Sequence, residues 1–347
     1  MKKGLKKWTV CAMAAILLWN LTACGEGGDS NSSPSASNSG DTSDATYTFS
    51  FATIDTEEHP TTLAARRLVE ILNEKAPGRF NITVYANGTL GQAAELVEAV
   101  QMGNVDIASP TTSFVANYVP NLSVLDMPYL FENTAQADAV LDGEIGKSLG
   151  AEVDAAGMKF LDFWEVGFRC LANNKRAIEN ADDVAQLRLR IMSSEIQEAL
   201  FTALGCDPVP MSLSDALVAN QQGTIDGMDN PLASLYTTSV YEFDHYIAVT
   251  NHTYTTQCVI MSEKAWNSMT PEDQEIFAEA VREATQFQRE TNRSQEEEAA
   301  NNLIERGCEI TYPDLSGFAE KMDVVYEQFP EYSDLIAQIQ EAAAGVQ

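Results

Sequence analysis

Apolar and polar positions alternate in short runs near the start of the chain and then recur at helical spacing. Residues 47–51 (Tyr-Thr-Phe-Ser-Phe) and 80–85 (Phe-Asn-Ile-Thr-Val-Tyr) alternate, which predicts two strands. Residues 60–75 and 93–102 instead place their apolar side chains on one face of a helix. With a further short strand at 105–108, the order strand–helix–strand–helix–strand predicts a parallel sheet covered by helices on both faces.

The second half of the chain repeats this pattern. Strands are predicted at 188–192 and 225–228, with helices at 193–204 and 212–222 between them. Residues 246–261 are again rich in strand formers and are expected to cross back to the first half. The sequence therefore predicts an α/β fold with two lobes, each a mixed, mostly parallel sheet flanked by helices.

One short unit occurs in both halves. A helix, a glycine stop, a β-branched residue and an aspartate follow one another up to Asp106 and again up to Asp226. Two such units suit two sheets that face each other across a cleft, with a ligand at the carboxyl ends of the parallel strands. We expect the two aspartates to hold turns rather than to contact the ligand.

A long helix is predicted near the end of the chain. Thr270 and Pro271 form a good helix start, and nothing stops the helix before Gly307. At about 1.5 Å per residue it would extend roughly 50 Å, which is more than the width of one lobe. We therefore expect it to run along both lobes, with a kink near Arg293 left open. Residues 314–347 predict a further helical tail.

The first residues resemble a targeting segment. Four lysines precede an apolar run at 8–18 that is too short to span a bilayer stably. Leu-Thr-Ala-Cys then resembles a bacterial lipobox, in which Cys24 would receive a diacylglycerol; an ordinary signal peptide with an incidental cysteine is the alternative. Residues 1–23 are thus predicted to be a signal peptide, and 24–46, rich in Ser, Asn and Gly, a lipidated tether. This predicts an extracytoplasmic protein, lipid-anchored to the periplasmic side or outer face of the cytoplasmic membrane.

The net charge of the chain argues against one class of partner, and the spacing of its cysteines argues against a zinc site. Acidic residues outnumber basic ones by 51 to 21, a net charge of −30, which argues against nucleic acid because phosphates need Lys and Arg. Local arginines can still bind a small anion in a cleft. Cys170, Cys206, Cys258 and Cys308 show no zinc spacing; we expect buried thiols, with disulfides left open.

Two arginines and an asparagine lie at the ends of predicted strands. Arg169 ends Gly-Phe-Arg, Arg190 ends Leu-Arg-Leu-Arg, and Asn230 precedes Pro231. A guanidinium presents parallel N–H donors that match a carboxylate, and an asparagine can donate to one oxygen and accept from a hydroxyl. We predict that these three residues bind a carboxylate. A structural salt bridge to one of the many acids is the alternative for each arginine.

Four further residues are weaker candidates for ligand contacts. Thr112 and Ser113 follow a predicted strand, although they could equally cap the next helix or turn. His59 lies in a loop that could reach the cleft or the surface, and Phe168 could form a cleft wall or pack in the core.

An enzyme is the competing class. His59, His245 and His252 are scattered without metal-ligand spacing, and the sequence has no Gly-x-Ser-x-Gly and no phosphate-binding loop. We therefore predict no catalytic residue, no metal and no cofactor. The many acids leave a carboxylate-dependent hydrolase as an alternative.

Six segments occur in an order that resembles a known family. They are Tyr85–Gly91, Leu125–Phe131, Gly167–Arg169, Leu187–Arg190, Ala219–Pro231 and Thr250–Tyr254. Together they resemble the extracytoplasmic solute receptors of TRAP transporters, the DctP-like family, over about residues 47–307. The resemblance implies a two-lobed, periplasmic-binding-protein-like fold with a long helix spanning both lobes. It also implies closure on an organic acid, which is delivered to a membrane permease driven by a sodium gradient.

The resemblance also implies site residues and lobe boundaries. Arg190 matches the family's carboxylate-clamping arginine, although Met192 replaces the usual proline, and Arg169 and Asn230 match two further positions. Gln92 stands near where the family often has a glutamate. Lobe one would comprise 47–166 plus about 255–293, and lobe two 167–254 plus about 294–347. A receptor for another importer or a sensor would share this pattern, and the organic acid itself stays open.

Overall fold

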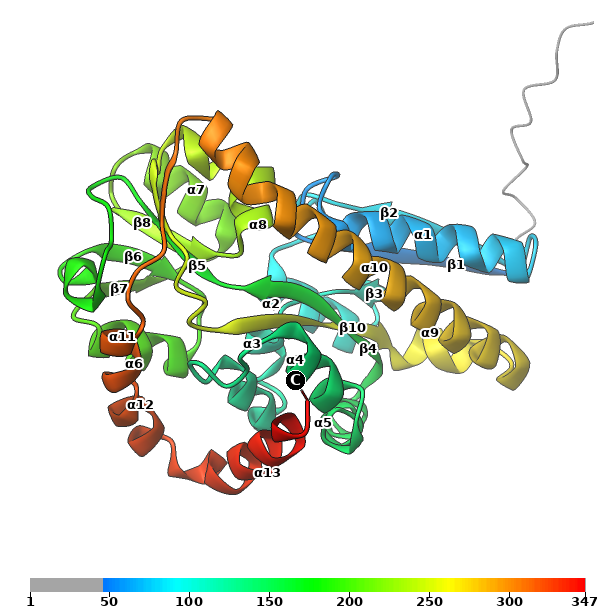
Figure 1. Ribbon diagram of the computed structural model, residues 1–347. Helices are drawn as coiled ribbons and strands as arrows, with labels where there is room; N and C mark the ends of the chain where they lie inside the picture. The colour runs from blue at the N-terminus through cyan, green and yellow to red at the C-terminus, as the bar shows by residue number, and fades with distance from the viewer. Residues whose placement is uncertain (1–45, 347) are drawn as a thin grey trace, which may run out of the picture. The chain divides into compact units, whose positions relative to one another are not determined.

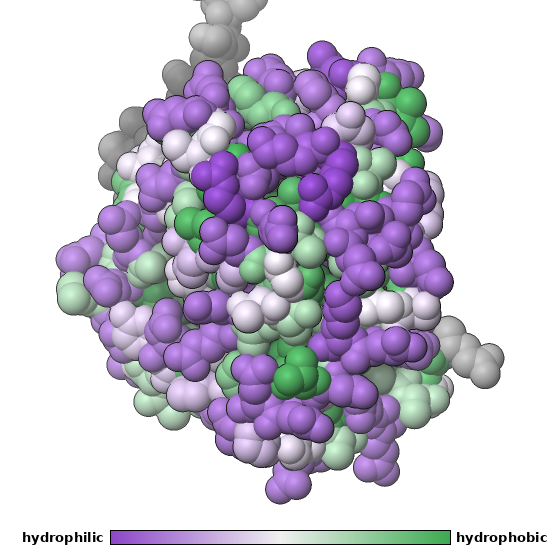
Figure 2. All heavy atoms as spheres, turned by 90° about the vertical axis from the view of Figure 1, so that its left-hand side faces the viewer, coloured by the Kyte–Doolittle hydropathy of each residue, from purple (hydrophilic) through white to green (hydrophobic). Residues whose placement is uncertain are grey.

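The computed structural model describes residues 46–346 (Figure 1). The predicted signal peptide and Cys24 lie outside this range. Within it, every helix is too short or too polar to cross a membrane. The face shown in Figure 2 carries mostly hydrophilic residues with scattered hydrophobic ones, as expected for a chain with this excess of acids.

The sheet of lobe one is mixed. Its five strands lie in the order β2-β1-β3-β10-β4. They are β1 (Tyr47–Ala52), β2 (Phe80–Tyr85), β3 (Ile107–Ala108), β4 (Met158–Phe168) and β10 (Tyr254–Ser262). β1 pairs in parallel with β2 and β3, as the strand–helix order predicts, while β10 runs antiparallel to β3 and β4. The predicted return of the chain to the first lobe is thus made by β10.

Helices cover both faces of this sheet. They are α1 (Pro60–Lys75), α2 (Ala93–Gln101), α3 (Thr112–Val115), α4 (Thr134–Leu141), α5 (Glu144–Ala155) and α9 (Glu263–Ser268). Successive strand residues point to opposite faces. Phe51 and Trp164 stack at 5.7 Å in the core under α1, whereas Ala52 and Phe163 belong to the core under α2 to α5. Trp164 is therefore a core residue.

The sheet of lobe two has six strands in the order β11-β9-β5-β8-β6-β7. They are β5 (Cys170–Asn173), β6 (Arg188–Ile191), β7 (Asp207–Pro210), β8 (Gly227–Asn230), β9 (Tyr246–Ala248) and β11 (Glu309–Thr311). β6 is parallel to β7 and β8, and β5 is antiparallel to β8 and β9. The flanking helices are α6 (Glu195–Ala203), α7 (Leu213–Gln221) and α8 (Leu232–Thr237). The two-lobed α/β fold predicted from the sequence is confirmed.

The two related aspartates hold equivalent positions. Asp106 Oδ2 accepts a hydrogen bond from the Ser50 N–H at 2.8 Å, and Asp226 Oδ2 accepts one from the Arg188 N–H at 2.9 Å. Each carboxylate thus bonds to the backbone of the neighbouring strand. Burial would raise the pKa of Asp226, but Arg188 and Lys175 lower it to about 2. As expected, both aspartates serve the fold and do not face the cavity described below.

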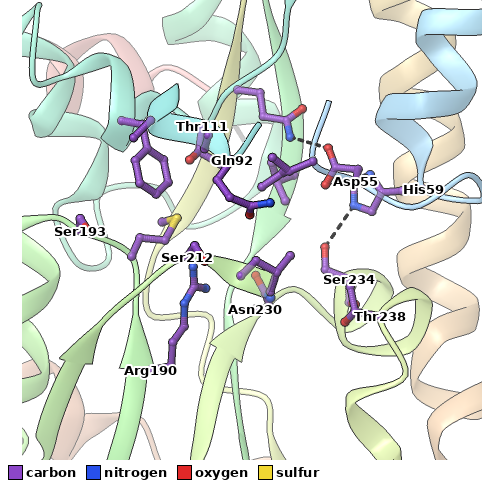
Figure 3. A pocket seen from close by; sticks show the side chains of 18 of the residues that line it. Asp55, His59, Gln92, Thr111, Arg190, Ser193, Ser212, Asn230, Ser234 and Thr238 are labelled. Atoms are coloured by element: carbon purple, nitrogen blue, oxygen red, sulfur yellow. Dashed lines mark hydrogen bonds and ion pairs between the residues drawn. The ribbon is translucent and has the colours of Figure 1, made fainter. Parts of the chain in front are cut away.

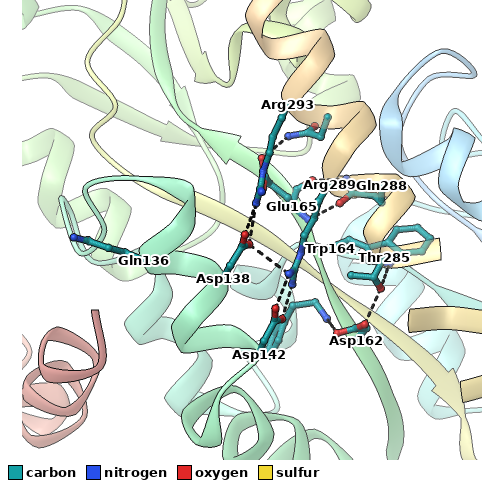
Figure 4. Close-up of polar contacts among 12 residues, drawn as sticks. Gln136, Asp138, Asp142, Asp162, Trp164, Glu165, Thr285, Gln288, Arg289 and Arg293 are labelled. Atoms are coloured by element: carbon teal, nitrogen blue, oxygen red, sulfur yellow. Dashed lines mark hydrogen bonds and ion pairs between the residues drawn. The ribbon is translucent and has the colours of Figure 1, made fainter. Parts of the chain in front are cut away.

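The long helix α10 (Pro271–Glu305) has 35 residues and contacts both lobes. It packs against α1 and β4 in lobe one and against α8 in lobe two (Figure 1). Figure 4 shows the polar contacts that bind it to lobe one. Arg293 Nη2 donates to Glu165 Oε2 at 2.7 Å and to Asp138 Oδ1 at 2.8 Å, and Arg289 pairs with Asp142. The predicted helix along both lobes is confirmed.

The C-terminal tail is helical but divides between the lobes. It comprises α11 (Ser316–Glu320), α12 (Asp323–Gln328) and α13 (Ser333–Ala344). α12 packs on α6 of lobe two, whereas α13 packs on α4 of lobe one through Ile336, Ile339 and Ala343. The sequence predicts lobe two for the whole tail. The apolar face of α13 indicates that the helix is packed but not which surface it covers, so we propose to assign α13 to lobe one.

Candidate ligand-binding site

Residues of both lobes line a cavity of about 180 Å³ (Figure 3). Lobe one contributes the loop after β1 (54–59), the start of α2 (92–94), residues 111–114 and Gln257; lobe two contributes 190–193, 212–213 and 230–238. Residues 54–59, 111–114, 190–193 and 230–238 lie at or after the carboxyl ends of β1, β3, β6 and β8. The cavity thus lies where an α/β sheet is expected to bind its ligand.

Arg190, on β6, is buried and lacks an acidic partner. Its Nε donates to the Met211 carbonyl oxygen at 3.0 Å, and its guanidinium forms no ion pair within residues 46–346. Burial, helped by the neighbouring positive charge of Arg169, lowers the pKa of Arg190 to about 10. A buried cation whose remaining donors face a cavity can bind an anion there. The alternative of a structural salt bridge does not apply to Arg190 in the described chain.

Arg169 also lines the cavity, but its charge is balanced by Asp229. Its Nε lies 2.5 Å from Asp229 Oδ2, and its Nη2 lies 3.0 Å from Oδ1. His252 Nε2 lies 3.3 Å from the same Oδ2. Burial would raise the pKa of Asp229, yet Arg169 and His252 hold it well below its usual range. The salt-bridge alternative therefore describes Arg169, and its contact with a ligand stays a prediction.

Asn230 ends β8 and lies at the same edge of the sheet as Arg190. Its side chain is 7% exposed, and its Nδ2 has no hydrogen-bond partner in the part of the chain that the structure describes. An unpaired buried donor costs about 1–3 kcal/mol, so it needs an acceptor from a ligand or a water molecule. Asn230 Nδ2 is thus a free donor in the same cavity lining as Arg190, and its contact with a ligand stays a prediction.

His59 lies in the cavity wall and is only 2% exposed. Its Nδ1 accepts a hydrogen bond from the Thr61 N–H at 3.2 Å, which caps α1. Its Nε2 lies 3.2 Å from Ser234 Oγ, so the imidazole links the loop of lobe one to α8 of lobe two (Figure 3). The interpretation of His59 as a cleft residue is the one that fits this position.

Thr112, Ser113 and Phe168 lie outside the cavity. Thr112 Oγ1 donates to the Thr256 carbonyl oxygen at 3.3 Å, and Ser113 Oγ donates to Asp126 Oδ1 at 2.8 Å. Phe168 packs edge-to-face on Tyr254 with the ring centroids 5.0 Å apart. Helix α3 begins at Thr112 and turns the two hydroxyls into the protein. The contacts of these three residues fit the capping and core-packing alternatives, and a contact of any of them with a ligand stays a prediction.

Thr111, one residue earlier, lines the cavity instead. Its Oγ1 is buried and lacks a hydrogen-bond partner within residues 46–346. Gln92, at the start of α2, points its side chain into the same space (Figure 3). The cavity therefore has a neutral amide near the position where the family often has a glutamate.

Asp55 and Gln257 are site residues that the sequence analysis missed. Asp55 Oδ2 accepts hydrogen bonds from Thr53 Oγ1 at 2.7 Å and from Gln257 Nε2 at 2.9 Å. Asp55 follows the first strand at its carboxyl end, and this position could have identified it. Gln257 lies inside β10, where nothing in the sequence marks it.

The four cysteines of the described residues lie outside the lining of this cavity. Cys170, Cys206, Cys258 and Cys308 are free thiols, and burial raises the pKa of Cys206 to about 12. The described residues hold no group of three or more His, Cys, Asp or Glu side chains placed to bind a metal ion. The expectation of buried thiols is confirmed for Cys170, Cys258 and Cys308, while Cys206 is partly exposed.

Comparison with known proteins shows that most of the chain matches one protein family. A family model described as bacterial extracellular solute-binding protein, family 7 (DctP), matches residues 51–332. The C4-dicarboxylate-binding protein DctB of Bacillus subtilis is 30% identical over 285 residues, which cover 81% of this chain and 81% of that protein.

Two crystal structures share the fold closely. The sugar acid binding protein of Advenella mimigardefordensis in complex with galactonate has a TM-score of 0.83 and 27% identity, and the match covers 87% of this chain and 99% of that one. A TRAP periplasmic solute binding protein from Sulfurospirillum deleyianum with bound succinate has a TM-score of 0.82 and 30% identity, over 85% and 99% of the chains.

Proposed function

The chain belongs to family 7 of the bacterial extracellular solute-binding proteins, the DctP family, and on this basis we propose that it captures a small organic carboxylate between its lobes and delivers it to a TRAP-type permease. Members of this family are receptors that work outside the cytoplasm. Both crystal structures described above contain bound carboxylates, galactonate in one and succinate in the other.

The observation that carries the proposal is the burial of Arg190 at the cavity without an acidic partner in the described chain. Arg190 is 3% exposed and lines a cavity between the lobes, where Asn230 supplies a second unpaired donor. A carboxylate would accept parallel hydrogen bonds from the guanidinium and neutralise a charge that is otherwise buried without an acid.

The same cavity favours a receptor over a hydrolase. A glycosidase-type hydrolase needs two carboxyl groups that flank the bond to be broken. Among the described residues that line the cavity, Asp55 is the one acid, and the nearby Asp229 is paired with Arg169 outside the lining. Binding and release therefore explain the arrangement better than acid–base catalysis.

The membrane attachment and the partner follow from the sequence and the family. We propose that Cys24 carries a lipid and that the residues up to about 46 tether the receptor to the membrane. Mass spectrometry of the protein from its native membrane should find an acylated N-terminal cysteine, and a free cysteine would contradict this. A sensor or another importer is the alternative partner, and a neighbouring pair of permease genes would favour the TRAP assignment.

A matched set of ligands tests the proposed function. A thermal-shift screen of the purified protein with organic acids, followed by calorimetry, should find acids that bind. The corresponding neutral amides should bind far more weakly, because they cannot neutralise Arg190. Equal binding of an acid and its amide would contradict a carboxylate receptor.

A further inference from the structure

The cavity has a single uncompensated cation. Asp55, His59, Arg169 and Arg190 are the ionisable residues in its lining. Arg169 is paired with Asp229. The Nδ1 of His59 accepts the Thr61 N–H and its Nε2 lies 3.2 Å from Ser234 Oγ, so both ring nitrogens are engaged by neutral groups. Arg190 alone is left to neutralise an acid group of a ligand.

The opposite wall of the cavity carries a negative charge. Figure 3 shows Asp55 on the loop of lobe one, across the cavity from Arg190 on β6. The hydrogen bonds that Asp55 accepts from Thr53 and Gln257 both go to Oδ2. Asp55 Oδ1 has no hydrogen-bond partner within residues 46–346. The nearest basic atom to Oδ1 is His59 Nδ1 at 3.8 Å, whose lone pair is already used. Oδ1 is therefore a free acceptor.

Two hydroxyl groups accompany this acceptor. Thr56 Oγ1 and Thr111 Oγ1 are both buried without hydrogen-bond partners in the described chain, and both residues line the cavity. Asp55 Oδ1 and the two hydroxyls can accept hydrogen bonds from ligand hydroxyls, and the charge of Asp55 repels a carboxylate.

We propose that the ligand is a small hydroxylated monocarboxylate and that Asp55 excludes diacids. This inference rests on the proposed function, in which the acid group binds Arg190 and Asn230. Hydroxyls at the other end of the ligand donate to Asp55 and contact Thr56 and Thr111. The second acid of a diacid would lie against Asp55 with no cation to neutralise it. A cavity of about 180 Å³ is smaller than the roughly 300–1,000 Å³ of sites for drug-sized molecules, which also favours a small acid.

Pairs of sugar acids that differ in one group test this inference. Galactonate and galactarate share their carbon chain and hydroxyls, but galactarate has a carboxylate where galactonate has a terminal CH₂OH; erythronate and meso-tartrate form a shorter pair. Calorimetry at neutral pH should show that the protein binds the monoacid of a pair at least about tenfold more tightly than the diacid. Equal or tighter binding of the diacids would overturn this inference and leave a carboxylate receptor in place. Failure to bind any carboxylate would overturn the proposed function itself.

A variant of Asp55 tests the cause of the selectivity. Asp55→Asn keeps an oxygen that can accept from Thr53 and Gln257 but removes the charge. The preference for monoacid over diacid should fall severalfold or more. Glu58→Gln is the matched control, because it removes an equal charge from an exposed residue of the same loop that does not line the cavity. An unchanged preference in Asp55→Asn, with normal thermal unfolding, would overturn the role of Asp55.

Discussion

Arg169 and Asp229 form a fully buried ion pair at the point where the chain passes from lobe one to lobe two. Two contacts join them, Nε to Oδ2 at 2.5 Å and Nη2 to Oδ1 at 3.0 Å, and the side chains are 1% and 0% exposed. Arg169 Nη2 also donates to the Asp229 backbone oxygen. The pair therefore fixes the start of β5 against the end of β8, while Arg190 keeps its charge for a ligand.

Substitution of Arg190 should strongly weaken carboxylate binding and preserve the fold. Loss of one member of a buried, hydrogen-bonded charge pair costs about 2–5 kcal/mol, so Arg190→Ala should weaken binding by roughly 30-fold to several thousandfold. Arg190→Lys should also bind poorly, because a single ammonium cannot reproduce the parallel donors. Calorimetry with an acid found in the screen measures both effects.

Arg188→Ala is the matched control for this prediction. Arg188 lies two residues earlier on β6, is 43% exposed and pairs with Asp226, away from the cavity. Its loss should leave the affinity nearly unchanged. If Arg190→Ala bound the acid as tightly as the unmodified protein, the assignment of Arg190 would have to be abandoned.

Loss of Asp229 should destabilise the protein severely. Asp229→Ala would leave the guanidinium of Arg169 buried without an acid, a change that costs about 3–5 kcal/mol. Urea denaturation should show a lower midpoint with an unchanged slope. Asp182→Ala, which removes an exposed carboxylate paired with Lys321, should change stability little. A similar, small effect in both variants would show that the buried pair contributes no more than a surface pair.

Much of the fold follows from local sequence. The predicted ranges 60–75 and 80–85 are also the bounds of α1 and β2, because Pro60 opens the helix and Pro77-Gly78 separates the two elements. β7 escaped prediction because Asp207-Pro-Val-Pro210 contains two prolines. Within sheets, proline is found mainly in edge strands, and β7 is an edge strand, but its place in the sheet becomes visible only in three dimensions.

Some residues of the candidate site can likewise be predicted from the sequence, while others become apparent only in the structure. Arg190 and Asn230 were predicted because each stands at the end of a strand, and their types suit a carboxylate. Gln257 depends on the tertiary structure: β10 has a register shift between Thr255 and Thr256, which changes which side chains face the cavity. Asp55 follows the carboxyl end of the first strand, a position that could have marked it among the 51 acidic residues, but its hydrogen bond from Gln257 becomes visible only in the structure.

Asp244 should make stability depend on pH. Burial raises the pKa of this carboxyl group to about 7, against the opposing hydrogen bond from Asn220 Nδ2 to Oδ2 at 2.6 Å. Because the folded pKa lies above the unfolded value of about 3.9, the folded protein must keep a proton that the unfolded chain loses. The contribution of Asp244 to the free energy of unfolding should therefore fall as the pH rises from about 4 to 7, by on the order of 2–4 kcal/mol.

Asp244→Asn isolates this contribution. The amide oxygen can still accept from Asn220, so the variant should match the protein near pH 4 and be more stable than the protein near pH 8. Chemical denaturation across this range measures the difference. A constant difference at every pH would mean that Asp244 does not titrate in the folded state within this window.

Ligand binding should close the two lobes. The chain passes between them after Phe168, before Tyr254 and along α10, while the cavity walls meet through the hydrogen bond between His59 and Ser234. A ligand whose acid group neutralises Arg190 on lobe two and whose hydroxyls reach Asp55 on lobe one would stabilise this closed arrangement, because it contacts both walls only when they are together. Small-angle X-ray scattering should show a smaller radius of gyration with saturating ligand than without. Arg190→Ala should keep the larger radius at the same ligand concentration, and an equal radius in all samples would contradict closure by the ligand.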